Sequence, residues 1–470
     1  MFKQIPAVVL AGLLITAGKV PGQPTAQEKN HGHRGPETTN YFNVIVPPHP
    51  YDLILARPEA QSVSLSVLTY ADLEGVVAYG SQPGAFTAET PVLRFKPGEP
   101  ITLALGPLTA NTRYHYTFRT RLAAAPAAAF IAGPEQSFQT ARAPGSTFRF
   151  TLTADAHLDG HTSPAVYNQT LANIRADQPD FHLDLGNLFM TDKHATRAEA
   201  AAQYVAQRYY LGQIGATVPV LLALGVHDGE AARYDDGTPG SLADWSNALR
   251  RRYFPNPLPD MFYTGNATRP LENYYAWQWG DALLVVLDPY RYSIRQRGGD
   301  DGWSWSLGAG QYQWLAQTLE QSRAKYKLVF IHNLLAGDQA SRGGVEIAGR
   351  GEWGGHNADG SDGFHAHRPG WALPVHELLR RHGVTAVFKA HDNFYARQEL
   401  DGILYLMVPQ PSFYGDNRIR DLTNYGYKQG VFLGNSGHVR VTVAPEQLTV
   451  EYVKSAPGAP VADRWVRAGH

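Results

Sequence analysis

The sequence contains no cysteine, which excludes disulfide bonds, thiolate nucleophiles and cysteine-bound metals. It also has no excess of either charge, because 41 Lys and Arg residues are balanced by 42 Asp and Glu residues. This balance gives no general reason to expect nucleic-acid binding or attraction to an anionic membrane. No apolar run after the first residues reaches the length of a transmembrane helix. Any metal site must therefore use Asp, Glu, His or Asn side chains.

A short apolar run lies at the N-terminus, from about Ile5 to Ala17, after the cation Lys3. This layout is typical of a secretory signal peptide, and the run is too short for a comfortable membrane span. The alternative is an uncleaved membrane anchor. We expect a leader over residues 1–22 and a flexible lead-in over residues 23–40. The mature protein is then periplasmic or extracellular, without stable membrane insertion.

Residues 41–143 show the pattern of an all-β domain. SVSLSVLTY alternates at period two, TRYHYTFRTR alternates aromatic and polar residues, and PGEP and GPLTANT supply turns. A chain of 470 residues is also long enough to require more than one packed core. The pattern predicts a small β-sandwich, and no cluster of ionisable residues marks it as a catalytic module.

From residue 144 onward, strand patterns alternate with helix patterns, which is typical of an α/β domain. The predicted strands end in polar residues, and a final antiparallel pair covers residues 437–453. We assign residues 144–455 to this domain and residues 456–470 to a C-terminal tail.

Polar and ionisable residues stand at the ends of five predicted strands. A single histidine there is more often structural than a ligand, but five such strand ends favour one shared site. Oxygen and imidazole ligands suit a divalent ion such as zinc, manganese or iron. Two such ions would bind a phosphoryl group and supply hydroxide at neutral pH. The strand-end residues are Asp155, His157, Asn187, His227, Asp228, His332, His391 and Asn393.

The order of these motifs resembles that of the calcineurin-like metallophosphoesterases, and most closely their bacterial purple-acid-phosphatase-like branch. The family's series is Asp-x-His, Gly-Asp, Gly-Asn-His-Asp/Glu, a lone His and Gly-His-x-His, and the resemblance covers about residues 41–453. It implies a four-layer α/β/β/α sandwich preceded by a fibronectin III-like β-sandwich, with a two-metal site between the large sheets.

The resemblance also implies a role for each matching residue. His227 would donate a proton to the leaving oxygen or stabilise it, and Asp228 would orient that histidine. Four positions match intact metal ligands: Asp155 and His157 for the first metal, His332 and His391 for the second.

Other positions depart from the family pattern. Asn187 replaces the bridging aspartate, Val226 replaces the asparagine of the third motif, and Ala390 and Asn393 alter the last motif. A bridging carboxylate offsets much of the repulsion between two divalent cations, so a neutral amide weakens such a site. Each metal would keep two good ligands and weak amide contacts from Asn187 and Asn393.

Nearby ionisable residues offer possible replacements for the lost ligands. Asp184 and Asp192 lie near the second motif, and His356, His365 and His367 lie in a glycine-rich loop. The alternative for that loop is a solvated lid with surface histidines. The sequence favours an exported phosphatase or phosphodiesterase that uses one or two divalent ions and a small phosphate-ester substrate. The alternative is a catalytically degenerate homologue that binds a ligand or partner without turnover.

Overall fold

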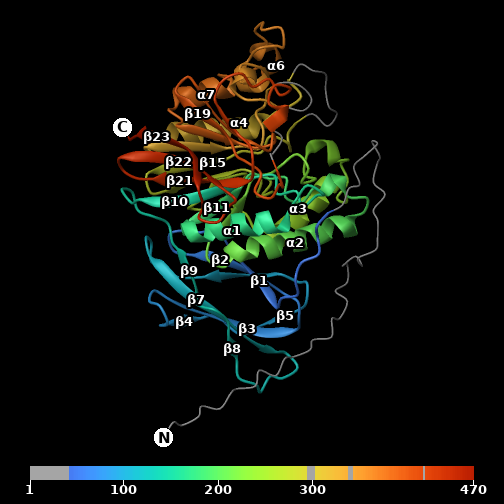
Figure 1. Cartoon of the computed structure of the whole chain (residues 1–470), viewed down its shortest axis with the longest axis vertical. Helices are drawn as coiled ribbons and strands as arrows, with labels where there is room; N and C mark the ends of the chain where they lie inside the picture. The colour runs from blue at the N-terminus through green and yellow to red at the C-terminus, as the bar shows by residue number, and fades with distance from the viewer. Residues whose placement is uncertain (1–41, 294–301, 337–341, 416–418, 470) are drawn as a thin grey trace.

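The computed structural model describes residues 42–293, 302–336, 342–415 and 419–469. Two β-sheets near the N-terminus stack against a larger body of sheets and helices (Figure 1). The expected leader and lead-in, residues 1–40, lie outside the described residues. In the ranges given above, no helix is long and apolar enough to cross a membrane.

The N-terminal region consists of two antiparallel sheets around one hydrophobic core. Leu65 and Phe118, one from each sheet, are 0% and 1% exposed. The all-β pattern therefore forms two packed sheets, while the fibronectin III-type assignment stays a prediction. The first sheet contains β1 (Tyr51–Ala56), β2 (Val63–Thr69) and β6 (Ile101–Leu105). The second contains β3 (Leu73–Gly80), β4 (Ala88–Glu89), β5 (Leu93–Phe95), β7 (Arg113–Leu122), β8 (Ile131–Ala132) and β9 (Gln136–Gln139).

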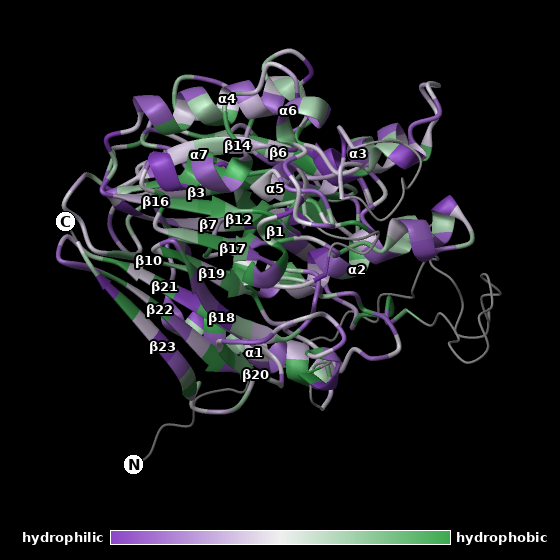
Figure 2. Ribbon diagram, turned by 90° about the horizontal axis from the view of Figure 1, so that it is seen from above, coloured by the Kyte–Doolittle hydropathy of each residue, from purple (hydrophilic) through white to green (hydrophobic). Residues whose placement is uncertain are grey.

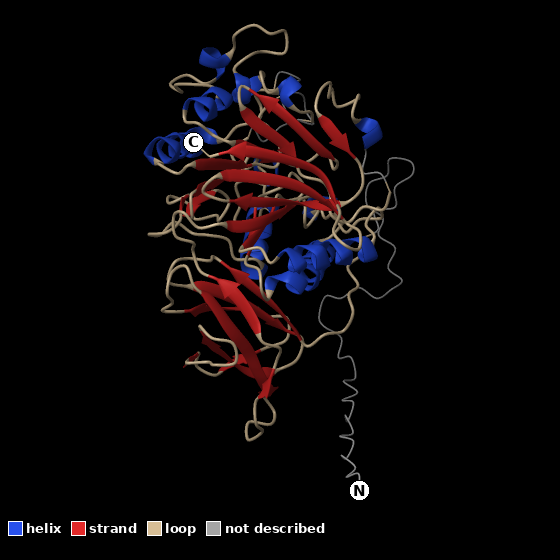
Figure 3. Ribbon diagram, turned by 60° about the vertical axis from the view of Figure 1, so that its left-hand side comes forward, coloured by secondary structure: helices blue, strands red, loops and turns tan. Residues whose placement is uncertain are grey.

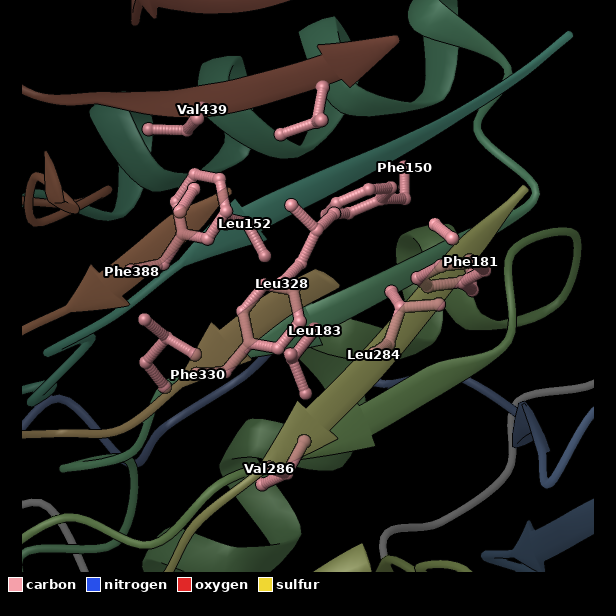
Figure 4. Packing of buried hydrophobic residues seen from close by; sticks show 14 of the residues in the cluster. Phe150, Leu152, Phe181, Leu183, Leu284, Val286, Leu328, Phe330, Phe388 and Val439 are labelled. Atoms are coloured by element: carbon pink, nitrogen blue, oxygen red, sulfur yellow. The ribbon is translucent and has the colours of Figure 1, made fainter. Parts of the chain in front are cut away.

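Two larger sheets form the centre of the α/β body (Figure 3). Their facing sides share one core, in which Phe150 and Leu183 of one sheet lie near Leu328 and Phe330 of the other (Figure 4). The six-stranded sheet has the order β12 (Val220–Leu222), β11 (Phe181–Asp184), β10 (Phe148–Thr153), β21 (Gly437–Val443), β22 (Gln447–Lys454) and β23 (Val461–Ala468). The eight-stranded sheet has the order β13 (Thr264–Gly265), β14 (Tyr275–Trp279), β15 (Ala282–Val286), β16 (Tyr326–Phe330), β17 (Ala386–Lys389), β19 (Ile403–Met407), β18 (Tyr395–Leu400) and β20 (Val431–Leu433).

Helices cover the outer faces of both large sheets. α1 and α2 pack on the six-stranded sheet, and α4 and α7 pack on the eight-stranded sheet. The strands between these helices are largely hydrophobic, whereas the helices mix hydrophobic and hydrophilic residues (Figure 2). This arrangement confirms the four-layer α/β/β/α fold predicted from the sequence. The helices are α1 (Pro164–Asp177), α2 (Arg197–Gly215), α3 (Leu242–Tyr253), α4 (Gly308–Gln321), α5 (Gly351–Gly354), α6 (Phe364–His367) and α7 (Val375–Arg381), with 3-10 turns η1 (Thr191–Lys193), η2 (Ala232–Tyr234), η3 (Val345–Ile347) and η4 (Ile419–Asp421).

The two helices beneath the site begin at clear sequence signals. The Ser163 side chain accepts a hydrogen bond from the Val166 N–H, and Pro164 occupies the first turn of α1. Thr196 and Glu199 form a capping box at the start of α2. These signals fix where the loops after β10 and β11 end and where α1 and α2 begin.

Two elements differ from the sequence-based expectation. Residues 461–468 fall in the expected tail but form β23, which pairs with β22 at the edge of the sheet. An edge strand is exposed along one side, so its composition is polar and its apolar signal is weak. Asp463 of β23 accepts hydrogen bonds from Tyr395 and Arg397, which attach it to β18. The sequence pattern also did not indicate α3, whose last turn carries three arginines.

Candidate ligand site at the strand ends

The predicted site residues lie in loops that follow parallel strands. β10, β11 and β12 run parallel in one sheet, and β16 and β17 run parallel in the other. The carboxyl ends of parallel strands meet at one edge, where α/β proteins hold ligands. Contacts connect the loop residues to one central carboxylate, Asp155.

Asp155 is fully buried and has nitrogen atoms on several sides. Its Oδ1 accepts a hydrogen bond from the Asn187 amide at 2.9 Å and lies 3.3 Å from His157 Nε2. Its Oδ2 accepts a hydrogen bond from the His391 backbone N–H at 3.0 Å. Burial alone raises the pKa of Asp155, but the neighbouring His332 and His157 hold it well below its usual range. The carboxylate is therefore charged, and N–H groups compensate that charge.

His157 lies between two carboxylates. Its Nε2 is 3.3 Å from Asp155 Oδ1, and its Nδ1 is 3.3 Å from Asp159 Oδ2. Burial lowers the pKa of His157, but the bonds to both carboxylates outweigh this and raise the pKa to about 9. In this arrangement both ring nitrogens are directed at carboxylate oxygens, so His157 links Asp155 to Asp159.

The orientation of the Asn187 side chain is fixed by a backbone donor. Its Oδ1 accepts a hydrogen bond from the His227 backbone N–H at 2.9 Å, and this N–H can only donate. The amide nitrogen of Asn187 must therefore point to Asp155. The chain can approach this closely because residue 225 is glycine: a Cβ there would lie 2.4 Å from Asn187 Oδ1. The position expected to bridge two metals thus presents N–H to the site.

Two other predicted ligands, His332 and Asn393, each have a buried acceptor atom without a hydrogen-bond partner among the described residues, and Val226 has no ligand atom. Val226 is buried in an apolar cluster and offers no lone pair. His332 donates from Nδ1 to the Leu185 carbonyl at 2.6 Å, and burial lowers its pKa to about 4. Its Nε2 therefore carries a lone pair, and it is buried without a hydrogen bond to any described residue. The buried Asn393 Oδ1 likewise has no hydrogen-bond partner in the described ranges.

The donor set does not fit the two-metal centre implied by the sequence resemblance. Among the described residues, no group of three or more His, Asp or Glu side chains is arranged to hold a metal ion. Asn187 directs its amide nitrogen inward, and Val226 has no ligand atom. Asn187 therefore lacks the charge of a bridging aspartate, as the sequence shows, and its amide also donates a hydrogen bond to Asp155.

His227 is positioned by Asp192 and not by Asp228, contrary to the expectation from the motif. Its Nδ1 lies 3.0 Å from both Asp192 oxygens, and Tyr234 donates to Asp192 at 2.6 Å. Burial lowers the pKa of His227, although Asp192 opposes this shift. The ring therefore has a fixed tautomer, with Nδ1 donating to the carboxylate and Nε2 free to act on a ligand.

Asp228 instead holds two loops together. Its carboxylate is 1% exposed and accepts hydrogen bonds from four backbone N–H groups at 2.7 to 3.0 Å. Burial raises its pKa to about 6, and these N–H bonds oppose the shift. With its oxygens occupied by the loops after β11 and β12, Asp228 has a structural role. The four donors belong to Asn187, Leu188, Phe189 and Gly225.

Of the residues suggested as replacement ligands, Asp192 joins the site through His227, and the other four do not. Asp184 is buried beneath it, where it accepts from Thr153 Oγ1 at 2.7 Å, and burial raises its pKa well above the usual value. The three loop histidines are exposed: His356 contacts the Gly349 carbonyl, and His367 stacks on Trp303 with ring centroids 4.4 Å apart. The structure therefore agrees with the alternative of surface histidines. The third histidine of this loop, His365, is exposed as well.

Two arginines that carry no sequence motif complete the rim. Arg233 donates to the Val226 carbonyl at 3.0 Å, and Arg342 donates to the His391 carbonyl at 2.5 Å. The Arg233 side chain is 15% exposed and that of Arg342 is 24% exposed. For comparison, the side chains of His157 and His227 are 12% and 19% exposed. Two partly exposed guanidinium groups thus lie beside the loops that contact Asp155. A rim that includes guanidinium groups suits an anionic ligand.

Comparison with known proteins supports the fold. No family model matches the sequence, and no curated protein matches it. The structure of PhoD superposes with a TM-score of 0.63 and 16% identity, over 93% of this chain and 92% of that one. The purple acid phosphatase PPD1 from yellow lupin (Lupinus luteus) seeds gives a TM-score of 0.60 and 16% identity, over 89% of this chain and 74% of that one. The chain therefore has the calcineurin-like metallophosphoesterase fold that its motifs indicate.

Proposed function

We propose that this chain is a metallophosphoesterase homologue that binds a small phosphate ester at the Asp155 site without a two-metal hydrolytic centre. One observation carries the proposal: the Asn187 amide nitrogen donates to Asp155 at 2.9 Å, where a bridging carboxylate would face the metals. An N–H group repels a cation and satisfies the carboxylate. The protein then keeps the fold and the ligand-facing rim but not the means to activate water with two metals.

The choice of a phosphate ester rests on the donors around the opening. Arg233 and Arg342 place partly exposed guanidinium groups beside the backbone of Val226 and His391. Phosphate oxygens accept hydrogen bonds from such groups strongly, because both partners are charged. A guanidinium also matches two phosphate oxygens at once. The ligand is accordingly a small anion, and the neutral overall charge gives no support for nucleic acid.

A second candidate function is metal-dependent phosphoester hydrolysis with one divalent cation. The observation that favours it is the buried lone pair of His332 Nε2, which lies 3.8 Å from Asp155 Oδ1 without a hydrogen bond to a described residue. Two facing acceptors are unfavourable unless a proton or cation lies between them. In that case His227, whose ring is oriented by Asp192, would need to take up a proton on Nε2 before it could donate one to the leaving oxygen.

Metal analysis and binding of the purified mature protein separate the two candidates. The binding proposal predicts calorimetric binding of inorganic phosphate and phenyl phosphate, no retained metal, and no hydrolysis of an aryl phosphate. The second candidate function predicts one bound metal per chain and hydrolysis of the aryl phosphate, which EDTA and the His332→Ala substitution should both abolish. Failure to bind phosphate in either the metal-free or metal-supplemented protein would refute both.

The destination of the protein is part of the same proposal. The apolar run from Ile5 to Ala17 favours export to the periplasm or the extracellular space. N-terminal sequencing of protein recovered outside the cytoplasm should find a start after the leader. An intact Met1 on a cytosolic product would contradict this.

A further inference from the structure

We infer that an aromatic platform beside the site, formed by His161, Phe413 and Tyr414, binds a planar aromatic group carried by the phosphate ester. The inference rests on the proposed phosphate-ester site and names the class of its ligand. The Phe413 and Tyr414 rings are nearly parallel, at 7°, with centroids 5.6 Å apart. His161 lies 5.5 Å from Phe413 and 6.2 Å from Tyr414.

The platform is attached directly to the loop that carries the central carboxylate. Asp159 is the link: its Oδ1 accepts from the His161 backbone N–H at 2.9 Å, and its Oδ2 lies 3.3 Å from His157 Nδ1. On the other side, the Tyr414 backbone N–H donates to the His161 carbonyl at 3.3 Å. One side chain thus separates the platform from a nitrogen donor of the site.

The exposure of the platform shows that it is not simply core. Tyr414 is 56% exposed, and His161 is also exposed. Within the described ranges, the large hydrophobic side chains that are exposed include only one other aromatic residue, Tyr292 at 37%. An exposed, stacked ring offers an apolar surface that a second planar ring covers favourably. Its place next to a rim of anion donors favours a ligand that has both a phosphate and an aromatic ring.

The competing explanation is that the three rings only fasten the loop after β19 to the loop after β10. The backbone already does this, because the Ser163 N–H donates to the Ser412 carbonyl at 2.7 Å and Thr162 forms a β-bridge with Phe413. The exposed ring of Tyr414 is not needed for that contact. Its removal therefore leaves the loops joined and tests ligand binding alone.

The test compares three probes on the full mature chain by calorimetry: phenyl phosphate, methyl phosphate and inorganic phosphate. The unmodified protein should bind phenyl phosphate about three- to tenfold more tightly than methyl phosphate, since one aromatic contact is worth this much. Tyr414→Leu should remove that preference and leave the affinity for inorganic phosphate unchanged. Tyr414→Phe keeps the ring and should behave like the unmodified protein.

The outcomes separate this inference from the function on which it depends. Binding of inorganic phosphate with equal affinity for the phenyl and methyl esters would overturn the platform alone. A Tyr414→Leu variant that weakens all three probes equally, or that retains the phenyl preference, would also overturn it. No binding of inorganic phosphate by the unmodified protein would overturn the proposed function and this inference with it.

Discussion

Replacing Asn187 by aspartate should turn the hydrogen bond at the centre of the site into a repulsion between two buried carboxylates. The Asn187 amide nitrogen lies 2.9 Å from Asp155 Oδ1, and both residues are at most 2% exposed. The backbone N–H of His227 continues to hold one oxygen of the new side chain, so the other oxygen faces Asp155. The variant therefore keeps the shape of the residue and changes only its charge and donor.

The size of the effect follows from charge and protonation. Two unit charges at this distance repel by about 6 kcal/mol at an effective dielectric constant near 20. The pair can avoid this by taking up one proton, which the unfolded chain does not hold at pH 7. Since pH 7 is about three units above the ordinary pKa of aspartate and one unit is worth about 1.4 kcal/mol, protonation limits the loss to about 4 kcal/mol.

The sign of the pH dependence is set by this proton. The folded variant has a raised carboxyl pKa, so its stability is highest below about pH 4 on this account and falls as the pH rises toward the folded pKa. Urea unfolding at pH 5 and pH 7 should show a larger deficit at pH 7. Asn187→Ala is the matched control, because it removes the same hydrogen bond without adding a charge.

A divalent cation should restore the folding stability that the added charge of Asn187→Asp removes. Manganese or zinc ions that bind between the two carboxylates would stabilise the folded variant by about 2.7 kcal/mol at a hundredfold excess over the dissociation constant. The unmodified protein and Asn187→Ala should not respond. Equal urea midpoints for Asn187→Asp and Asn187→Ala at both pH values, with no response to metal, would refute the placement of this amide against Asp155.

Two further substitutions should add metal ligands to the Asn187→Asp variant. Val226→Asn adds an oxygen and Asn393→His adds a nitrogen, both to an Asn187→Asp background. The triple variant should hold more metal per chain by elemental analysis than the sum of the single variants indicates, because ligands of one centre act together. A folded triple variant with no additional metal would show that these side chains do not converge.

Three further predictions concern carboxylates in and beneath the site. Asp192→Asn removes the negative charge that opposes the effect of burial, so the pKa of His227 should fall further. An NMR titration of its ring protons would show this, and an unchanged midpoint would contradict the contact. Asp228→Asn should cost about 3 kcal/mol in urea unfolding, because an amide cannot accept from all four backbone donors. Asp184→Asn should cost less than about 1 kcal/mol, since burial already favours the neutral form of that side chain. Equal losses of stability in Asp228→Asn and Asp184→Asn would refute the different roles assigned to these two carboxylates.

The succession of strands and helices along the chain and the convergence of several strand ends could be predicted from the sequence, because both depend on repeated patterns. Short apolar runs between helix patterns, such as that of β12, indicate buried strands, and parallel strands place their carboxyl ends together. The residue types at those ends then indicated one shared site. What the pattern could not supply was the direction of each side chain, which decides between metal binding and hydrogen bonding at Asn187.

The remaining errors have the same origin. Asp228 adjoins His227 in sequence, but its oxygens point at backbone N–H groups, and the partner of His227 is Asp192, which is 35 residues away. Arg233 and Arg342 reach the rim from loops without a motif, so no pattern identified them. Contacts between distant segments depend on how the loops fold, and a single sequence carries no direct signal of that kind.

The backbone at the strand ends favours a ligand-binding role over a structural remnant. Asp155, Asn187, His391 and Asn393 have φ values of 61°, 58°, 86° and 68°, a conformation that costs about 1 to 3 kcal/mol for such residues. Ala390, which replaces the glycine of the motif, is not among the residues with positive φ, so this replacement adds no backbone strain. The strained turns persist because hydrogen bonds over-determine them, as the His391 N–H on Asp155 shows. Backbone conformations of this kind cluster at ligand sites, so four of them at the converging strand ends are consistent with the proposed site.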